Sequence, residues 1–248
     1  MRGDVSDNDE TGATPEAPGR QPVFLLPGVV TALAGVMLAI HLASTFIFNE
    51  ESALQFTVWF GFIPARIVLG NEIPGGLLPL IWTPFTHAFL HAGWDHILIN
   101  AAWLAIFATP VSRRYGAWLT IAIFLLSAAA GAALFAATTL PNLQILVGAS
   151  GGVAGLTGAA VRFIFQPVVF ATDPATGEQR ILGRRIAPLR ALLSEPRTRY
   201  FVLVWVVLNA AVPLLPAFTG TEVQVAWQAH LGGFFAGLLM VGLFERRG

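Results

Sequence analysis

Long apolar stretches separated by short polar segments dominate this chain. A helix needs about 20 mostly apolar residues to cross the hydrocarbon core of a bilayer. Stretches of this kind recur along the sequence, and we predict six membrane-spanning helices near residues 23–48, 93–110, 117–138, 150–170, 200–217 and 226–244. The predicted fold class is therefore all-α, a polytopic membrane protein with a six-helix membrane domain over residues 23–245.

The segments outside these stretches differ in character. Residues 1–22 are polar and acidic with few large apolar side chains, so we expect a disordered tail. The connection 49–92 is rich in aromatic residues, proline and glycine, and we expect short interfacial helices lying partly in the membrane. The loop 171–199 carries six arginines, and we interpret it as a cytoplasmic loop that contacts anionic lipid headgroups.

Composition agrees with a membrane protein and excludes several chemistries. The chain is 55% hydrophobic and 11% charged, whereas soluble domains carry about 25% charged residues. Cysteine and lysine are both absent, which excludes disulfides, thiolate nucleophiles and lysine bases. We predict no cofactor, no metal and no nucleic-acid partner, and the sequence leaves the oligomeric state open.

The arginines indicate the orientation of the chain. With six spans both termini face the same side, and that side receives 12 of the 14 arginines, whereas Arg66 falls in the connection 49–92 and Arg162 within the fourth stretch. Cytoplasmic loops of membrane proteins carry an excess of positive charge. We therefore predict an integral membrane protein with both termini in the cytoplasm, and the absence of a targeting peptide favours a bacterial inner membrane.

Polar residues at the start of the second, fourth and sixth stretches are predicted to lie at one depth. His96 and Asn100, Ser150, and His230 fall within the first few residues of these stretches, which all run from outside to inside. At 1.5 Å per residue each lies within roughly 10 Å of the outer boundary. Polar groups at membrane depth are costly and mark function by default.

Ser150 and His230 could form a nucleophile and its base. A serine hydroxyl attacks a carbonyl only when a neighbouring base takes its proton, and histidine is the usual base. Asp173, Glu178 and Glu195 fall on the cytoplasmic side, and Asp95 sits at a helix start. We therefore expect a Ser-His dyad, although Glu222 in the last outer loop stays open as a third member.

An oxyanion could be bound beside this pair. His96 and Asn100 are four residues apart and so share a helix face. Each can donate an N–H, as can the backbone of Ser150 at its helix start, and such donors stabilise tetrahedral intermediates. We expect His91, just before the second stretch, to position the loop, and we expect Gly148 to lie with these donors beside the serine.

Glycines at intervals of four residues accompany both candidate catalytic residues. Gly151 and Gly155 follow Ser150, and Gly233 and Gly237 follow His230. Small residues at this spacing let helix backbones approach closely in a membrane. We expect these four glycines to pack the fourth and sixth helices together and bring the serine towards the histidine.

Together these motifs resemble the rhomboid intramembrane serine proteases, over roughly residues 23–245. The resemblance rests on His91, His96 and Asn100, on the segment 148–151, and on the segment 229–237 with its histidine and glycines. It implies a rhomboid-like bundle in which Ser150 is the nucleophile, His230 the general base, and His96, Asn100 and the Ser150 amide the oxyanion site. The implied substrates are other membrane proteins, cut in or near a transmembrane segment.

One departure from the family pattern concerns the histidine. Many relatives place an aromatic residue four positions after the serine, where it packs against the base, whereas this chain has Ala154. Many also carry a Trp-Arg pair in the first loop, whereas Trp82 here is followed by Thr83. The sequence thus leaves open how the ring of His230 is oriented.

Three alternatives to a protease each agree with part of the sequence. A catalytically inactive rhomboid-like protein would bind membrane segments without cutting them, but it would usually lack the serine or the base. The pattern Gly-x-Ser-x-Gly also matches the nucleophile elbow of α/β-hydrolases, which needs a soluble strand-turn-helix rather than flanking apolar stretches. His91, His96 and His230 could also bind a metal, although no His-Glu-x-x-His spacing occurs.

Overall fold

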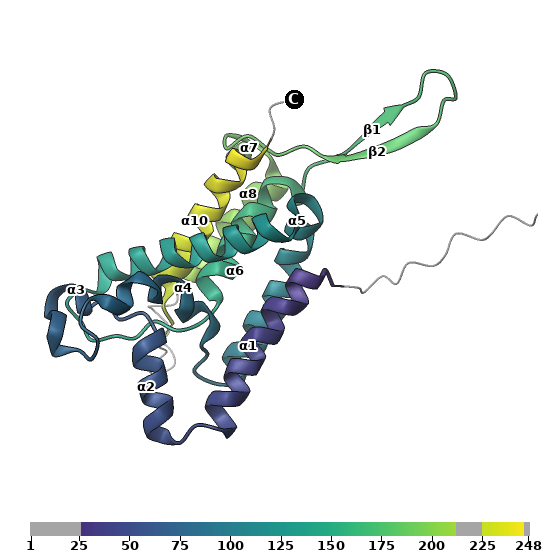
Figure 1. Cartoon of the computed structure of the whole chain (residues 1–248). Helices are drawn as coiled ribbons and strands as arrows, with labels where there is room; N and C mark the ends of the chain where they lie inside the picture. Colours follow the sequence, from purple (N-terminus) through teal and green to yellow (C-terminus); the bar gives the residue numbers. More distant parts are fainter. Residues whose placement is uncertain (1–25, 212–224, 246–248) are drawn as a thin grey trace, which may run out of the picture.

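The computed structural model describes residues 26–211 and 225–245 and is mostly helical (Figure 1). The tail predicted for residues 1–22, the end of the fifth predicted span and Glu222 lie outside the described residues. The longer helices are α1 (Gly28–Phe46), α2 (Glu50–Phe60), α5 (Trp94–Thr139), α6 (Ser150–Ile164), α8 (Pro196–Ala211) and α10 (Trp227–Phe244). Within the described residues, α1, α5 and α10 are long and apolar enough to cross a membrane.

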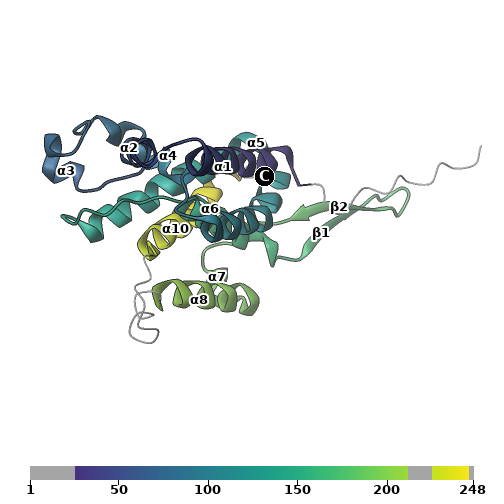
Figure 2. The same ribbon diagram turned by 90° about the horizontal axis from the view of Figure 1, so that it is seen from below.

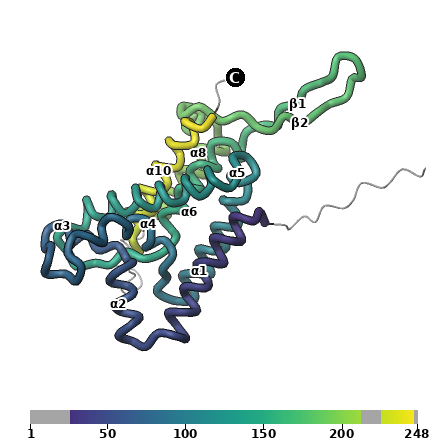
Figure 3. Tube along the Cα trace, viewed as in Figure 1, coloured from purple at the N-terminus to yellow at the C-terminus, as the bar shows by residue number. Residues whose placement is uncertain are grey.

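Helix α5 covers the second and third predicted stretches. A straight helix of its 46 residues would be about 70 Å long, more than twice the hydrocarbon core of a bilayer, which is about 30 Å thick. The helix bends at Gly116, whose φ of 79° and ψ of 176° are not helical, and its two halves run in different directions (Figure 3). Each half is long enough for one crossing.

Helix α6 ends six residues before the predicted end of the fourth stretch. The last helical residue is Ile164, and Pro167 follows shortly after. Proline has no amide hydrogen, and its ring disfavours the helical conformation of the residue before it. The prediction of a helix to residue 170 was therefore wrong because it counted hydrophobicity and overlooked this break.

A two-stranded antiparallel hairpin then departs from the all-α prediction. Strands β1 (Val168–Thr172) and β2 (Gln179–Arg184) pair with each other and project from the helices (Figure 1). The Arg114 guanidinium, beside the bend of α5, donates to the carbonyl of Arg184 and to the carboxylate of Glu245 at the end of α10. A short helix, α7 (Ala191–Ser194), and α8 follow, so α8 begins four residues earlier than predicted.

The connection 49–92 forms short helices, as its composition predicted. After α2 come α3 (Arg66–Leu69), α4 (Thr83–Thr86) and the 3-10 turns η1 (Gly70–Glu72), η2 (Leu78–Ile81) and η3 (His87–Phe89). The buried guanidinium of Arg66 organises them by donating hydrogen bonds to the backbone carbonyls of Val58, Pro74 and Gly76. Exposed apolar side chains remain at Leu77, Leu78 and Ile81, which suits a segment lying against lipid.

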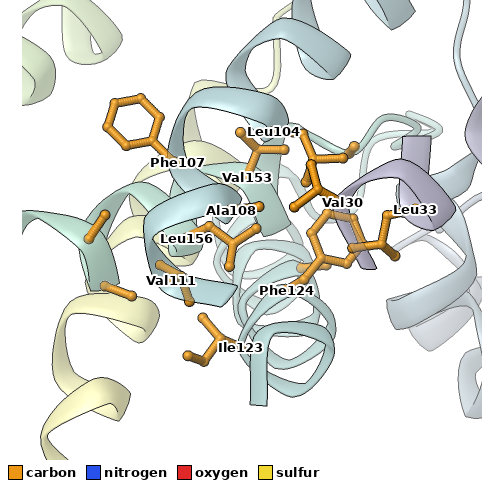
Figure 4. Packing of buried hydrophobic residues seen from close by; sticks show 14 of the residues in the cluster. Val30, Leu33, Leu104, Phe107, Ala108, Val111, Ile123, Phe124, Val153 and Leu156 are labelled. Atoms are coloured by element: carbon orange, nitrogen blue, oxygen red, sulfur yellow. The ribbon is translucent and has the colours of Figure 1, made fainter. Parts of the chain in front are cut away.

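Helix α6 lies at the centre of the molecule, between α1 and α8 (Figure 2). Every residue from Gly151 to Phe163 is buried, and a helix that is apolar on all sides is an interior helix. Its Val153 and Leu156 pack with Leu104 and Phe124 of α5 and with Val30 of α1 (Figure 4). The start of α6, where Ser150 lies, is therefore held from several sides.

Helices α6 and α10 approach until their backbones touch. A Cβ atom at Gly233 would overlap the carbonyl group of Gly151, and one at Gly237 would overlap the carbonyl group of Gly155. On the neighbouring face of α6, a Cβ at Gly155 would collide with the side chain of Ser127 from α5. The contact geometry thus leaves no room for a side chain at Gly155, Gly233 or Gly237. At Gly151 an added Cβ would make only ordinary contacts, the nearest 3.4 Å from the carbonyl of Ala229.

Candidate active site at the start of helix α6

Ser150 is the first residue of α6 and opens into a cavity of about 200 Å³. The cavity lies between α5, α6, α8 and α10 and is lined by Ile99, Asn100, Trp103, Ser150, Val153, Ala154, Thr157, Trp205, Asn209 and His230. Ser150 and His230, which are 80 residues apart in the sequence, therefore share one cavity. Among the hydrogen bonds of the described residues, none joins the two side chains. In unliganded enzymes catalytic hydrogen bonds are often long and tighten only with substrate.

His96 packs against the loop that leads into α6. Gly148 has a φ of 119°, in the region that favours glycine, and a Cβ placed there would lie 2.6 Å from Cε1 and 2.7 Å from Nε2 of His96. The imidazole therefore lies directly over the Gly148 backbone, two residues before Ser150. This contact places a ring nitrogen of His96 against the loop that leads to the serine.

His91 and His87 fix the same loop through hydrogen bonds. The Ala149 N–H donates to Nε2 of His91 over 3.4 Å, and the Gly148 N–H donates to the carbonyl of His87 over 2.9 Å. The rings of His91 and His96 meet edge to face with centroids 5.1 Å apart. The residues just before Ser150 are thus held by the segment that precedes α5.

The state of His91 matches its role as an acceptor. Burial, helped by the nearby His96 and His41, lowers the pKa of His91 to about 4. The ring is therefore neutral near pH 7, and a neutral imidazole can accept one hydrogen bond through Nε2. His91 lies outside the helices and holds the backbone, which is the geometry that loop positioning requires.

Asn100 lies on the wall of the cavity and is buried. Its Nδ2 donates to the carbonyl of His96 over 2.9 Å, as expected for residues one helical turn apart. An amide group carries two N–H donors, so one hydrogen remains for a ligand in the cavity. Of the two sequence-predicted side-chain donors, Asn100 thus lines the cavity, whereas His96 is not one of its lining residues and contacts Gly148 instead.

His230 has a partner that the sequence analysis did not identify. Its Nδ1 lies 2.8 Å from Oδ1 of Asn209 in α8. The sequence does mark Asn209 as a candidate, because it is a polar residue within an otherwise apolar stretch, as the other polar residues of the site are. It was missed because only the helices running from outside to inside were compared.

The other polar residues near the site, Asp95, His41 and His87, do not line this cavity. Asp95 is exposed at the start of α5. The buried His41 packs edge-on against Trp94, and the ring of His87 is bonded to the carbonyl of Thr83. Within residues 26–211 and 225–245, no group of three or more histidine, aspartate or glutamate residues is arranged to hold a metal ion.

The chain matches a known family and two plant proteins. Residues 79–247 match the Rhomboid domain family. RHOMBOID-like protein 1 of Arabidopsis thaliana is 27% identical over 66% of this chain and 34% of its own length. RHOMBOID-like protein 5 of the same plant is 24% identical over 93% of this chain and 73% of its own length. The chain thus spans about a third of the length of the first relative.

A helical protein with candidate membrane spans and this domain over most of its length is an integral membrane protein. The chain belongs to the rhomboid family. The resemblance seen in its motifs is thereby confirmed at the level of the family.

Proposed function

We propose that this protein is an intramembrane serine endopeptidase. The observation that carries the proposal is the shared cavity, which collects Ser150, His230 and Asn100 from three helices. The contact of His96 with Gly148 adds a further donor beside the serine. Membership of the rhomboid family supports the same activity, since that family generally includes intramembrane serine proteases.

The proposed reaction is acyl transfer. The Ser150 hydroxyl attacks the carbonyl carbon of a peptide bond while Nε2 of His230 takes its proton. The negative charge that develops on the carbonyl oxygen is bound by the side chains of His96 and Asn100 and by the Ser150 amide, whose position at the helix start leaves it without an intrahelical acceptor. His230 then gives the proton to the leaving amine, and water hydrolyses the acyl-enzyme.

The walls of the cavity favour an apolar peptide segment as substrate. Trp103 of α5 and Trp205 of α8 line the cavity at Ser150, and both also line an apolar cavity of about 400 Å³ farther along these helices. The two cavities share this pair of aromatic walls, so they adjoin each other between α5 and α8. We infer that transmembrane segments of other membrane proteins approach the serine from the bilayer along this path.

Labelling by an active-site probe tests the proposal. Detergent-solubilised protein is incubated with a fluorophosphonate, and cleavage of a transmembrane reporter protein is measured in parallel. We expect labelling and cleavage by the wild type and neither by Ser150→Ala. Labelling that persists in Ser150→Ala, or a folded wild type that neither reacts nor cleaves, would overturn the assignment.

An inactive rhomboid-like protein that binds membrane segments is the second candidate. The observation that favours it is the lack of a hydrogen bond between Ser150 and His230 among the described residues. Such a protein would retain the reporter in a pull-down experiment without cutting it. His230→Ala separates the two candidates, because it abolishes cleavage by an enzyme and leaves capture by a binding protein unchanged.

We further propose six crossings, both termini in the cytoplasm and a location in a bacterial inner membrane. In support, the helices follow the predicted stretches in order, with α5 supplying two at its bend. Because the chain has no cysteine, single cysteines introduced into the tail, the hairpin and the connection 49–92 report the topology directly. A membrane-impermeant maleimide should label only the last from the periplasm.

A further inference from the structure

The side-chain amide of Asn209 is oriented by its own helix. Its Nδ2 donates to the carbonyl of Trp205 over 2.8 Å, one turn earlier in α8. This bond leaves Oδ1 directed at Nδ1 of His230, 2.8 Å away in α10. The assignment of oxygen and nitrogen in the amide follows from this, because the carbonyl of Trp205 can only accept.

The orientation of the amide determines which nitrogen of the ring carries the proton. An amide oxygen only accepts hydrogen bonds, so Nδ1 of His230 must be the donor. In the neutral ring the lone pair then resides on Nε2. Nε2 is the atom that would take a proton from Ser150, which lines the same cavity.

A stacked aromatic pair holds the two helices one turn farther along. Trp205 and Phe234 stack with centroids 4.3 Å apart and ring planes inclined by 19°. Asn209 follows Trp205 by four residues, and Phe234 follows His230 by four. Helices α8 and α10 are thus joined by two successive contacts, and in the polar one both residues line the cavity.

We propose that Asn209 is the positioning residue for the base, holding His230 in the Nδ1–H tautomer with Nε2 free towards Ser150. The inference rests on the proposed function, and it supplies the orienting group that the sequence left open. Ala154, which faces the cavity from α6, has no ring to pack against the imidazole. The amide of α8 takes over this task by a directed hydrogen bond.

The surroundings of His230 leave Asn209 as its polar partner. The charged or titratable neighbour that influences His230 is His96 of α5. The other polar residues that line the cavity are Asn100, Ser150, Thr157 and Asn209, none of which is charged. Among the hydrogen bonds of the described residues, the one to the His230 ring is with Asn209. A pH-dependent change at His230 is therefore governed by His96 and by the partner of Nδ1.

Tautomer measurement tests the proposal without relying on catalysis. The protein is labelled with ¹⁵N-histidine in detergent, and the ring signals of His230 are assigned by their loss in His230→Asn. We expect Nδ1–H in the wild type and a mixture of both tautomers in Asn209→Leu, which has a similar volume and no acceptor. The same single tautomer in Asn209→Leu would overturn the inference.

Kinetics provide the second readout. We expect Asn209→Leu to lower the fluorophosphonate labelling rate about 10- to 100-fold. Asn209→Asp keeps the acceptor, so it should retain most of the rate, and its carboxylate should move the acid limb of the pH profile to higher pH by favouring the imidazolium. The control is Val207→Ala, at an exposed position of the same helix that lines neither cavity, which should match the wild type.

The outcomes separate the two proposals. A wild type that is not labelled contradicts the proposed function, whatever the tautomer. A labelled wild type whose rate and pH profile are unchanged in Asn209→Leu and Asn209→Asp contradicts only the role of Asn209. Should Asn209→Leu fail to fold, the shift of the acid limb in Asn209→Asp decides the question alone.

Discussion

The imidazole of His96 lies over the backbone of Gly148, so closely that a single added methyl group at residue 148 would sit 2.6 Å from the ring. This contact joins α5 to the start of α6 beside Ser150. Since the loop is also bonded to His87 and His91, the proposed oxyanion site is built by the segment 87–100 acting on residues 148–150. Its geometry depends on the absence of a side chain at Gly148.

Gly148→Ala should inactivate the protein without unfolding the bundle. The new methyl group must displace His96, and the φ of 119° disfavours any residue other than glycine. Loss of one oxyanion donor lowers rates by about 10²–10³, and we expect a fall of this size in reporter cleavage. Circular dichroism should show an unchanged helix content, and full activity in the variant would contradict this geometry.

Asn100→Ala should lower turnover while leaving substrate affinity nearly unchanged. The free N–H of the Asn100 amide is proposed to bind the oxyanion, which exists only in the transition state, so its loss costs about 10²–10³ in kcat. Reporter cleavage at several substrate concentrations gives kcat and KM separately. A rise in KM at constant kcat would instead assign Asn100 to ground-state binding.

Gly237→Ala should destabilise the pairing of α6 with α10. Its methyl group would overlap the carbonyl of Gly155, so the helices must separate, at a cost of about 1–3 kcal/mol. Gly242→Ala in the same helix is the matched control, because its methyl group would meet only the end of the Arg162 side chain at 3.8 Å. Thermal unfolding in detergent should show a lower Tm for the first variant alone.

Stability should fall as the pH drops below about 6.5. Burial lowers the pKa of His87 to about 4 from an ordinary value of 6.5, against smaller opposing effects of its hydrogen bonds to backbone carbonyls. Between pH 6.5 and pH 4 the imidazole of His87 is therefore protonated in the unfolded chain but neutral in the folded chain. The contribution of His87 to the free energy of unfolding is complete above pH 6.5 and is lost as the pH falls towards 4.

The measurement is the unfolding free energy in detergent at pH 7.5 and pH 5. At pH 5 the loss due to His87 amounts to about 2 kcal/mol, and His91, whose pKa is lowered in the same direction, adds to it. His87→Gln should flatten the pH dependence. An equally steep dependence in this variant would show that other groups cause it.

The positions of the helices could be predicted because hydrophobicity alone marks them. The stretches near 23–48 and 226–244 correspond to α1 and α10 within a few residues. The end of α6 and the hairpin depend instead on local features that hydrophobicity does not register, namely Pro167 and the pairing of Val168–Thr172 with Gln179–Arg184.

The site was predictable only where it consists of residues with known chemistry in a known order. Ser150, His230 and Asn100 were chosen for their chemistry and their predicted depth, and the structure brings them to one cavity. Asn209 belongs to a helix that runs in the opposite direction, so no comparison of helix starts could pair it with His230. The orientation of the His230 ring depends on the residues that contact it in the folded protein, and the hydrophobic pattern of the sequence does not identify these residues.

The proposed base comes from α10, 80 residues after the serine. On the proposed chemistry, a growing polypeptide that has not yet reached residue 230 carries a hydroxyl that nothing deprotonates. Such a chain is consequently harmless to the translocation machinery that handles it, and proteolytic competence arrives only once α10 has been made.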